Sequence, residues 1–451
     1  MITEKIYDLK KRRNTLHTTW NPGREDVLRI HIIPPKFRPF ASPETLVTIN
    51  GQDTIPISER QAILLNEYVS RLNMLDPDPD DKAMAKVIDD AYKSIRLVYP
   101  FTTKDEMCRE LDRLIGTFED VAAGRPIEDT GSHLTLGQYS VFMDAPHRVD
   151  LMVSSMVKCG AWHCNQKCIH CYAAEQELAG EDELSLGDWK RVIDILRDNK
   201  VTQLTFTGGE PTMRDDLPEM ISYARWFVTR LNTNGAKLTP ELCASLRAAE
   251  LDSMQVTFYS HDRDVHNKLV GAKNFDKTVD GIRNALQAGI NLSINTPICE
   301  LNSDYEETLR FAHSLGVRYV TCSGLILTGY AKTDRSSELH ISSDKLSVVL
   351  ENAVNFAYKN DIELNFTSPG IISDEKLISL GLDIPSCGAC LSNMAVSPSG
   401  NVVPCQSWLS DNPLGNILKD SWKEIWNCDE CRRIRQISAA EDHICQLRDH
   451  A

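Results

Sequence analysis

The sequence predicts an α/β protein built around a parallel sheet, with a smaller module on either side of it. Between residues 148 and 330, six short apolar segments alternate with amphipathic helical patterns at a spacing of roughly 35 residues, which is typical of βα units. Residues before 123 combine short β-rich runs with helical patterns, and the region after residue 370 is rich in cysteine. Repeated βα units form either a partial (β/α)6 barrel or a doubly wound sheet. Both folds place functional residues at the carboxyl ends of the strands.

The N-terminal region reads as a β-hairpin followed by three helices. The segment "TLVTINGQDTIPI" has two β-rich runs around an Asn-Gly pair, which suits a tight turn. Ser58 and Gln61 form a capping-box signal that opens a helix, and further helical patterns lie near 82–96 and 104–122. This order predicts a small winged-helix-like module over residues 1–125, and such modules usually bind a partner.

The middle region carries the predicted parallel sheet. Its helical segment "LGDWKRVIDILRD" places apolar side chains on one face, and another helix begins with Thr239 as N-cap and Pro240 at the first helical position. The strands are predicted at "VDLMVSSMV", "TQLTFTG", "FVTRLNT", "SMQVTFYS", "NLSINTPI" and "VRYVTCSG".

Composition limits the classes of partner. Asp and Glu total 64 against 49 Lys and Arg, and this net charge of -15 argues against a mainly electrostatic grip on nucleic acid or acidic lipid. No segment approaches the roughly 18 consecutive apolar residues of a membrane span, and the N-terminus lacks the apolar stretch of a signal peptide. We therefore expect a cytoplasmic protein with neither nucleic acid nor membrane as its partner.

The fourteen cysteines fall into two clusters and a scattered remainder. Because cytosolic thiols are kept reduced, the clusters favour metal binding over disulfides. We expect most of the scattered cysteines to be ordinary buried thiols. These are Cys108, Cys159, Cys243, Cys299 and Cys322.

The first cluster, "CNQKCIHCY", follows the first predicted strand and contains Cys164, Cys168 and Cys171. A structural zinc ion would need a fourth ligand, which His163 or His170 could supply. A four-iron cluster normally takes four cysteines, so three would leave one iron free to hold a substrate or cofactor.

This C-x3-C-x2-C spacing, on the loop after the first strand of a six-fold βα pattern, resembles the signature of radical S-adenosylmethionine (SAM) enzymes. The resemblance implies a partial, TIM-like (β/α)6 barrel over residues 148–335. It implies that Cys164, Cys168 and Cys171 hold a catalytic 4Fe-4S cluster whose open iron binds SAM. In this family an electron from the cluster, itself supplied by a reductase, flavodoxin or ferredoxin, produces a 5'-deoxyadenosyl radical, which takes a hydrogen atom from the substrate.

Further motifs match this family in order. "TGGEP" at 207–211 follows the second strand, as does the family motif that receives the methionyl amine, and "NTNG" at 232–235 ends the third strand. His170 occupies the position whose backbone contacts the adenine. The resemblance therefore implies that the following residues bind SAM: His170, Tyr172, Gly208, Gly209, Glu210, Asn232, Asn234 and Thr257.

The second cysteine cluster resembles the SPASM or twitch extension of such enzymes, which carries auxiliary iron-sulfur clusters. We expect this domain over residues 370–451, with a bridging helix and strand at 336–369 and a linker at 126–147. The pattern departs from a full SPASM domain at Ile437 and Glu441, where cysteines would be expected. The candidate metal ligands are Cys387, Cys390, Cys405, Cys428, Cys431 and Cys445.

Six thiolates cannot complete two four-iron clusters. The most economical set is one auxiliary cluster held by Cys387 or Cys390 together with Cys405, Cys428 and Cys431. A second cluster would need a ligand other than cysteine. Zinc remains an alternative here, because C-x2-C pairs also occur in zinc ribbons.

SPASM-type enzymes most often modify peptides and proteins. The N-terminal module resembles the precursor-recognition domains of peptide-modifying enzymes, which bind a leader peptide as an added strand. Leu46–Ile49 or Thr54–Ile57 could provide the edge for this pairing, although the module could instead be a structural plug.

The leading hypothesis is a radical SAM oxidoreductase that matures a ribosomally made precursor peptide (RiPP biosynthesis). It would form a cross-link, a thioether or a related product. The alternatives are a radical enzyme for a small molecule such as a sugar, nucleotide or tetrapyrrole, and a zinc-stabilised binding protein without catalysis.

Overall fold

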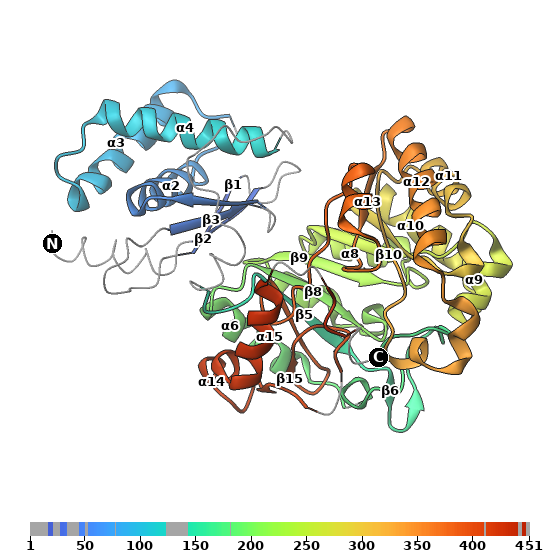
Figure 1. Cartoon of the computed structure of the whole chain (residues 1–451). Helices are drawn as coiled ribbons and strands as arrows, with labels where there is room; N and C mark the ends of the chain where they lie inside the picture. The colour runs from blue at the N-terminus through green and yellow to red at the C-terminus, as the bar shows by residue number, and fades with distance from the viewer. Residues whose placement is uncertain are drawn as a thin grey trace. The chain divides into compact units, whose positions relative to one another are not determined.

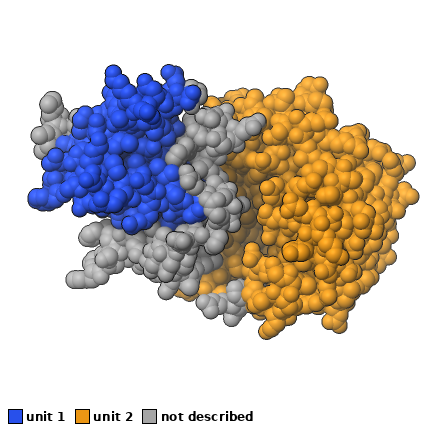
Figure 2. Space-filling model, turned by 90° about the horizontal axis from the view of Figure 1, so that it is seen from above, with its two compact units in different colours: residues 1–143 blue, residues 144–451 orange. Residues whose placement is uncertain are grey.

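A computed structural model describes most of the chain as two compact units, residues 1–143 and 144–451, which Figure 2 colours separately. The described residues are 17–20, 28–33, 45–49, 53–76, 78–122, 143–180, 182–409, 412–440 and 444–447.

The described residues of the first unit form a four-stranded antiparallel sheet in sequential order and three helices (Figure 1). The predicted hairpin is confirmed, with Thr45 opposite Ile57, and Ser58 and Gln61 form the predicted capping box. Two further strands extend the hairpin at its N-terminal side. The elements are β1 (His17–Trp20), β2 (Leu28–Ile33), β3 (Thr45–Ile49), β4 (Asp53–Ile57), α2 (Glu59–Leu72), α3 (Asp81–Val98) and α4 (Lys104–Ala122).

Strand pairing decides which of the two predicted segments is an edge. Leu46–Ile49 lies in β3, which pairs with β2 on one side and β4 on the other, so its prediction as an edge is wrong. Thr54–Ile57 lies in β4, which is an outer strand of the described sheet. Pro56 suits this position, because a proline lacks the N–H that an inner strand needs.

The second unit is built on a long, mostly parallel sheet, in which all six predicted strands are confirmed. They pair side by side in the order of the chain (Figure 1). The strands are β5 (Arg148–Ser154), β8 (Gln203–Gly208), β9 (Val228–Thr233), β10 (Ser253–Thr257), β11 (Leu292–Pro297) and β12 (Tyr319–Ser323).

Helices alternate with these strands, as the periodicity predicted. Trp189, Val192, Ile193 and Leu196 form the buried face of the first of them, and Thr239 caps α8. The helices are α6 (Leu186–Asp198), α7 (Leu217–Tyr223), α8 (Pro240–Ala248), α9 (Arg263–Val270), α10 (Phe275–Gln287), α11 (Tyr305–Ser314) and α12 (Ser343–Lys359).

The sheet is longer than predicted at both ends. Beyond β12, it is joined in parallel by β13 (Glu363–Phe366). Beyond β5, it is joined in parallel by β14 (Asn393–Val396), to which β15 (Asn401–Val403) and β16 (Gly415–Asn416) are added antiparallel. The order runs from β13 to β16 without closing on itself, so the barrel is partial.

The two faces of the sheet differ in polarity. Leu231, Val256 and Ile294 alternate along their strands with polar residues and are fully or almost fully buried. Since successive side chains of a strand point to opposite faces, the polar positions share the other face. That face is the inside of the partial barrel, where Asn232 and Gln255 line a cavity.

The cysteine-rich region adds the short helices α13 (Asp374–Ser379), α14 (Trp422–Asn427) and α15 (Asp429–Ala439). The Trp422 indole N–H donates to the Asp144 carbonyl over 2.9 Å and so ties this region to the start of the second unit. No helix in the described ranges is both long and apolar enough to cross a membrane.

The scattered cysteines largely match their prediction as buried thiols. Cys243, Cys299 and Cys322 are buried, and Cys108 is half-buried. Cys159 is exposed, because it lies in the turn of a two-stranded hairpin formed by β6 (Val157–Lys158) and β7 (Ala161–Trp162).

Candidate active site

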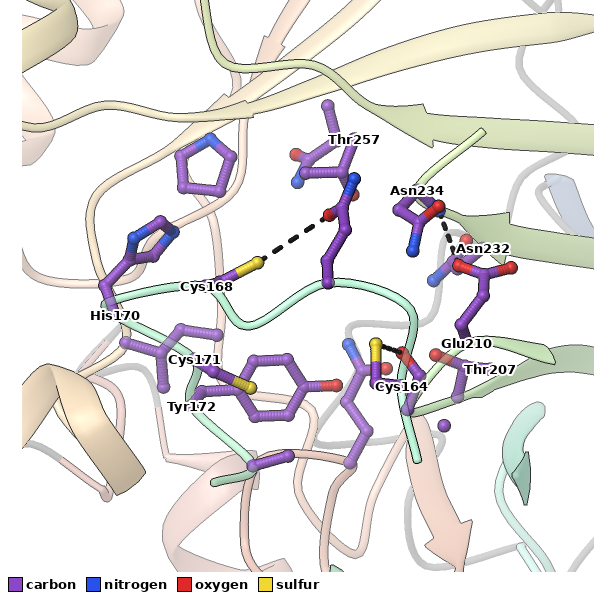
Figure 3. A pocket seen from close by; sticks show the side chains of 18 of the residues that line it. Cys164, Cys168, His170, Cys171, Tyr172, Thr207, Glu210, Asn232, Asn234 and Thr257 are labelled. Atoms are coloured by element: carbon purple, nitrogen blue, oxygen red, sulfur yellow. Dashed lines mark hydrogen bonds between the residues drawn. The ribbon is translucent and has the colours of Figure 1, made fainter. Parts of the chain in front are cut away.

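One cavity lies at the carboxyl ends of β5 and β8 to β12. Figure 3 shows three sulfur atoms on one loop, with Glu210 and Asn234 on the side of Cys164 and with His170 beside Cys168. All the residues predicted for the radical site line this cavity: Cys164, Cys168, His170, Cys171, Tyr172, Gly208, Gly209, Glu210, Asn232, Asn234 and Thr257.

The three thiols lie in a poor environment for a free thiolate. Burial raises the pKa of Cys164 to about 12 and also raises the pKa of Cys168 and of Cys171. The described residues lining the cavity include no Lys or Arg that could offset a thiolate charge. A metal centre would supply that positive charge, since thiolates are the form of cysteine that binds metal.

The spacing of the donor groups bears on the kind of metal. Ligands of a single zinc ion lie about 2.0–2.3 Å from one point. Among the described residues, no three His, Cys, Asp or Glu side chains gather closely enough to hold one ion. His170 instead lies 3.0 Å from the Tyr259 hydroxyl, and His163 lies 3.5 Å from Glu183. The two histidines that could have completed a zinc site therefore have other partners.

Glycines hold the cysteine loop from two sides. The Lys167 N–H donates to the Val270 carbonyl over 3.0 Å, and the Tyr330 N–H donates to the Cys171 carbonyl over 2.9 Å. Next to these contacts, Gly271 and Gly329 have positive φ angles of 61° and 56°. A Cβ at either glycine would overlap carbonyl oxygens of the cysteine loop. Only glycine allows this close approach without strain.

Glu210 lies at the centre of a buried hydrogen-bond network. One carboxylate oxygen accepts from the Thr212 N–H, the Thr212 hydroxyl and the Thr233 hydroxyl, and the other accepts from the Asn234 N–H over 2.8 Å. Burial raises the pKa of Glu210, while these donors oppose the rise. The second oxygen retains capacity for another donor.

The Gly-Gly turn before Glu210 packs directly on β5. A Cβ at Gly208 or at Gly209 would overlap the backbone of Ser154 or of Ser155. The Ser154 hydroxyl also accepts from the Glu210 N–H over 3.0 Å. The close packing of these two glycines on β5 therefore fixes the position of the Glu210 carboxylate in the cavity.

Several buried polar atoms of the cavity have no partner among the described residues. They are Nδ1 of His170, Oδ1 of Asn232 and Oε1 of Gln406. Burial lowers the pKa of His170 to about 4, so its ring is neutral near pH 7. Such free hydrogen-bonding atoms around three thiols suit a polar cofactor such as SAM.

Sequence reasoning missed residues that come from other parts of the chain. Tyr259 and Gln406 line the cavity but belong to no recognised motif. Gln176 joins the cysteine loop to the C-terminal region, since its amide donates to the carbonyls of Tyr172 and Ser407 and accepts from the Leu409 N–H. Only the tertiary structure reveals these roles.

The C-terminal cysteines are arranged differently. Cys390 and Cys431 shift each other's thiol pKa, as do Cys387 and Cys445, so each pair lies close together. Cys390 has a positive φ of 54°, which is unusual for a residue with a side chain and is typical of constrained sites.

The other two cysteines of this region have different partners. Cys405 interacts electrostatically with Cys387, Cys390 and Cys445. Cys428 caps α15 by accepting from the Cys431 N–H over 3.4 Å. Ile437, where a full SPASM domain would have a cysteine, is 42% exposed, and Glu441 lies outside the described residues.

Comparison with family models identifies both cysteine regions. Residues 163–312 match the model of the Radical SAM superfamily. Residues 387–447 match SPASM, an iron-sulfur cluster-binding domain.

Proteins of similar sequence are named for different activities. Mycofactocin maturase MftC of Mycolicibacterium smegmatis is 28% identical over 291 residues, which are 61% of this chain and 71% of that protein. Fe-coproporphyrin III synthase of Methanosarcina barkeri is 36% identical over 142 residues. That match covers 31% of this chain and only 35% of the synthase.

The fold is similar to that of SuiB from Streptococcus suis. The structure bound to S-adenosylmethionine has a TM-score of 0.62 at 16% identity, covering 94% of this chain and 95% of SuiB. The structure bound to precursor peptide SuiA also has a TM-score of 0.62, at 14% identity and with 96% of each chain covered. At these identities the likeness establishes the fold alone.

Proposed function

Since the chain is a radical SAM enzyme with a SPASM domain, we propose that it is a peptide maturase. It would abstract a hydrogen atom from a ribosomally made precursor peptide and form a cross-link, a thioether or a related modification. The observation that carries this proposal is the fold of the whole chain, which follows SuiB over 96% of its length, the first unit included. SuiB binds a precursor peptide.

We assign the cavity residues to the cofactors as follows. Cys164, Cys168 and Cys171 would hold the 4Fe-4S cluster, and the remaining predicted residues of the cavity would hold SAM. When bound, these cofactors supply the 5'-deoxyadenosyl radical that removes the hydrogen atom. The residues around them would bind and orient SAM and exclude water from the radical.

Glu210 would bind the methionyl amine. Its second carboxylate oxygen accepts only from the Asn234 N–H among the hydrogen bonds of this network, so it can accept from an ammonium group. The donors from Thr212 and Thr233 favour the ionised form of Glu210 that this role needs. His170 would place its backbone beside the adenine, and its neutral ring is held by Tyr259.

The first unit would bind the leader peptide. We propose that residues 1–125 form this recognition module and that β4 offers the edge to which the leader adds as a strand. Main-chain hydrogen bonds would supply affinity, and side-chain pockets would set the register. Pro56 removes one backbone donor from this edge, so the pairing must use the other residues of β4.

The C-terminal region would hold an auxiliary cluster through cysteines of the set 387, 390, 405, 428, 431 and 445. We further propose a reductase, flavodoxin or ferredoxin as the electron donor. Both assignments follow from the chemistry of this enzyme class.

A tetrapyrrole substrate is the second candidate, and the likeness to Fe-coproporphyrin III synthase favours it. Porphyrin substrates of that kind carry several carboxylates. The cavity lining offers no Lys or Arg among its described residues to pair with them. We therefore place the peptide first.

Anaerobic coexpression with the short reading frames beside the gene tests the proposal. Mass spectrometry would detect a loss of two hydrogens for a cross-link, a gained methyl for methylation, or an unchanged mass for epimerisation. Deleting residues 1–125 should weaken binding of a peptide that is modified. Turnover of a tetrapyrrole by the deletion variant, together with unmodified peptides in every coexpression, would replace the peptide proposal with the second candidate.

A further inference from the structure

Helix α15 carries arginines at 432, 433 and 435 that face two different environments. Arg432 and Arg433 are exposed and lie near carboxylates of their own helix, Asp429 and Glu430. Arg435 is half-buried and turns toward the cysteines. Its Nη1 lies 3.4 Å from the Cys431 sulfur and 3.5 Å from the Cys390 carbonyl oxygen.

Trp426 fixes the guanidinium of Arg435. The Nη2 group donates to the Trp426 carbonyl over 3.0 Å, and the guanidinium carbon lies 3.9 Å from the centre of the Trp426 ring. This ring contact is a close cation–π interaction. The position of the charge is therefore set by Trp426 as well as by the thiols.

Within the described part of the chain, no carboxylate pairs with Arg435. The ion pairs of α15 involve only Arg432 and Arg433, and no described carboxylate lies within 4.0 Å of Arg435. A fixed positive charge next to sulfur in a partly buried site acts more strongly than one in water. Two of the candidate cluster ligands, Cys390 and Cys431, lie beside this charge.

We propose that Arg435 raises the reduction potential of the auxiliary iron-sulfur cluster. Reduction adds one negative charge to a cluster, and a nearby cation stabilises the reduced state relative to the oxidised state. Hydrogen bonds to the sulfurs of an iron-sulfur cluster, and charges near them, change its reduction potential. Arg435 is thus a positioning residue that would make the cluster a better electron acceptor. The inference rests on the proposed role of Cys390 or Cys431 as a ligand and needs no identified peptide.

A redox titration of the reconstituted full-length protein tests the inference. Electron paramagnetic resonance follows the cluster whose signal does not change when SAM is added. At a fixed potential, the ratio of reduced to oxidised auxiliary cluster should be at least tenfold lower in the R435Q variant than in the wild-type protein. This change equals a fall of about 59 mV in the reduction potential of a one-electron couple. The R435K variant keeps the positive charge and should shift less.

The R432Q variant is the matched control, because Arg432 is an exposed arginine of the same helix that acts on Cys431 only through space, so its removal should lower the potential less. Equal potentials in R435Q and R432Q would overturn the inference. So would loss of the auxiliary iron in both R435Q and R435K, because Arg435 would then serve only to support the fold. A shifted potential in a protein that modifies no peptide would count against the proposed function alone, and an unshifted potential in an active maturase would count against this inference alone.

Discussion

The two cysteine-rich regions of the chain differ in what surrounds their thiols. In the first, Cys164, Cys168 and Cys171 line a cavity that has a buried carboxylate, Glu210, and no Lys or Arg among its described lining residues. In the second, thiols lie in two pairs that shift each other's pKa, and Arg435 lies 3.4 Å from the Cys431 sulfur. In the first region, the positive charge that offsets the thiolates must come from bound cofactors. In the second region, the guanidinium of Arg435 supplies part of this charge.

The two regions also differ in how the backbone holds them. Gly271 and Gly329 allow other segments to approach the first cysteine loop closely. The second region uses strain at Cys390 and a sulfur cap from Cys428. Substitutions can therefore separate the contribution of each region.

The largest effect should come from removing a thiol of the first region. The C168A variant should lose reductive cleavage of SAM, because a cluster bound by fewer cysteines does not present its open iron in the same way. Chromatography of 5'-deoxyadenosine measures this. Cys159, exposed in the hairpin just before the loop, gives the control, and C159A should retain cleavage. Wild-type yields from C168A would refute the assignment.

A backbone change at Gly329 should have the next largest effect. In G329A, the new Cβ would overlap carbonyl oxygens of the cysteine loop, so the loop must move. A shift of about 1 Å can lower a rate by roughly a hundredfold. We expect a comparable loss of 5'-deoxyadenosine formation and a lower iron content.

Gly289 provides a control of matched backbone strain. Its φ is also positive, at 70°, but a Cβ there would meet nothing within 4 Å. The G289A variant should lose about 1–2 kcal/mol of stability and keep its iron. Equal iron content in G329A and G289A would show that the close approach does not hold the loop.

The pH dependence of SAM binding should follow the ionisation of the Glu210 carboxyl group. Burial raises the pKa of Glu210 above its ordinary value, so the carboxyl group takes up its proton at a higher pH than an exposed glutamate. Because the methionyl amine needs the ionised form, affinity should rise with pH through this raised pKa. The T233V variant loses a donor to the carboxylate and should move the midpoint upward. Equilibrium dialysis across the acidic range measures both curves, and identical midpoints would contradict the role of Thr233.

The smallest effect is expected at Tyr259. The Y259F variant removes the hydroxyl that lies 3.0 Å from Nε2 of His170 and leaves this buried nitrogen without that partner. A hydrogen bond of this kind contributes about 1 kcal/mol, so affinity for SAM should fall about fivefold. Calorimetry of SAM binding would detect this change. An unchanged affinity would mean that the orientation of His170 does not depend on Tyr259.

Local patterns predicted the six strands of the barrel, because each strand is a short apolar run between amphipathic helices. The capping box at Ser58 was equally readable, since its two partners lie three residues apart. Many residues of the cavity could be predicted for the same reason, because "CNQKCIHCY" and "TGGEP" each contain several of them within one loop.

Pairing between distant segments was not readable. The sequence of β3 does not reveal that β2 covers its outer side, and this is why Leu46–Ile49 was wrongly predicted as an edge. The strand β14 is only four residues long and lies among cysteines, so nothing local identifies its pairing with β5. Gln406 reaches the cavity only because of that pairing and of the bonds to Gln176.

The pairing of β14 with β5 bears on how the chain can be divided. The strand that precedes the first cysteine loop has a SPASM-region strand as its neighbour. A single apolar cluster also combines Met152 and Ala173 from one region with Ala395, Val403 and Leu409 from the other. A protein truncated before β14 would expose the edge of β5 and open this cluster, and we expect it to aggregate. The two family regions are separate in sequence, but they should unfold together as one cooperative unit.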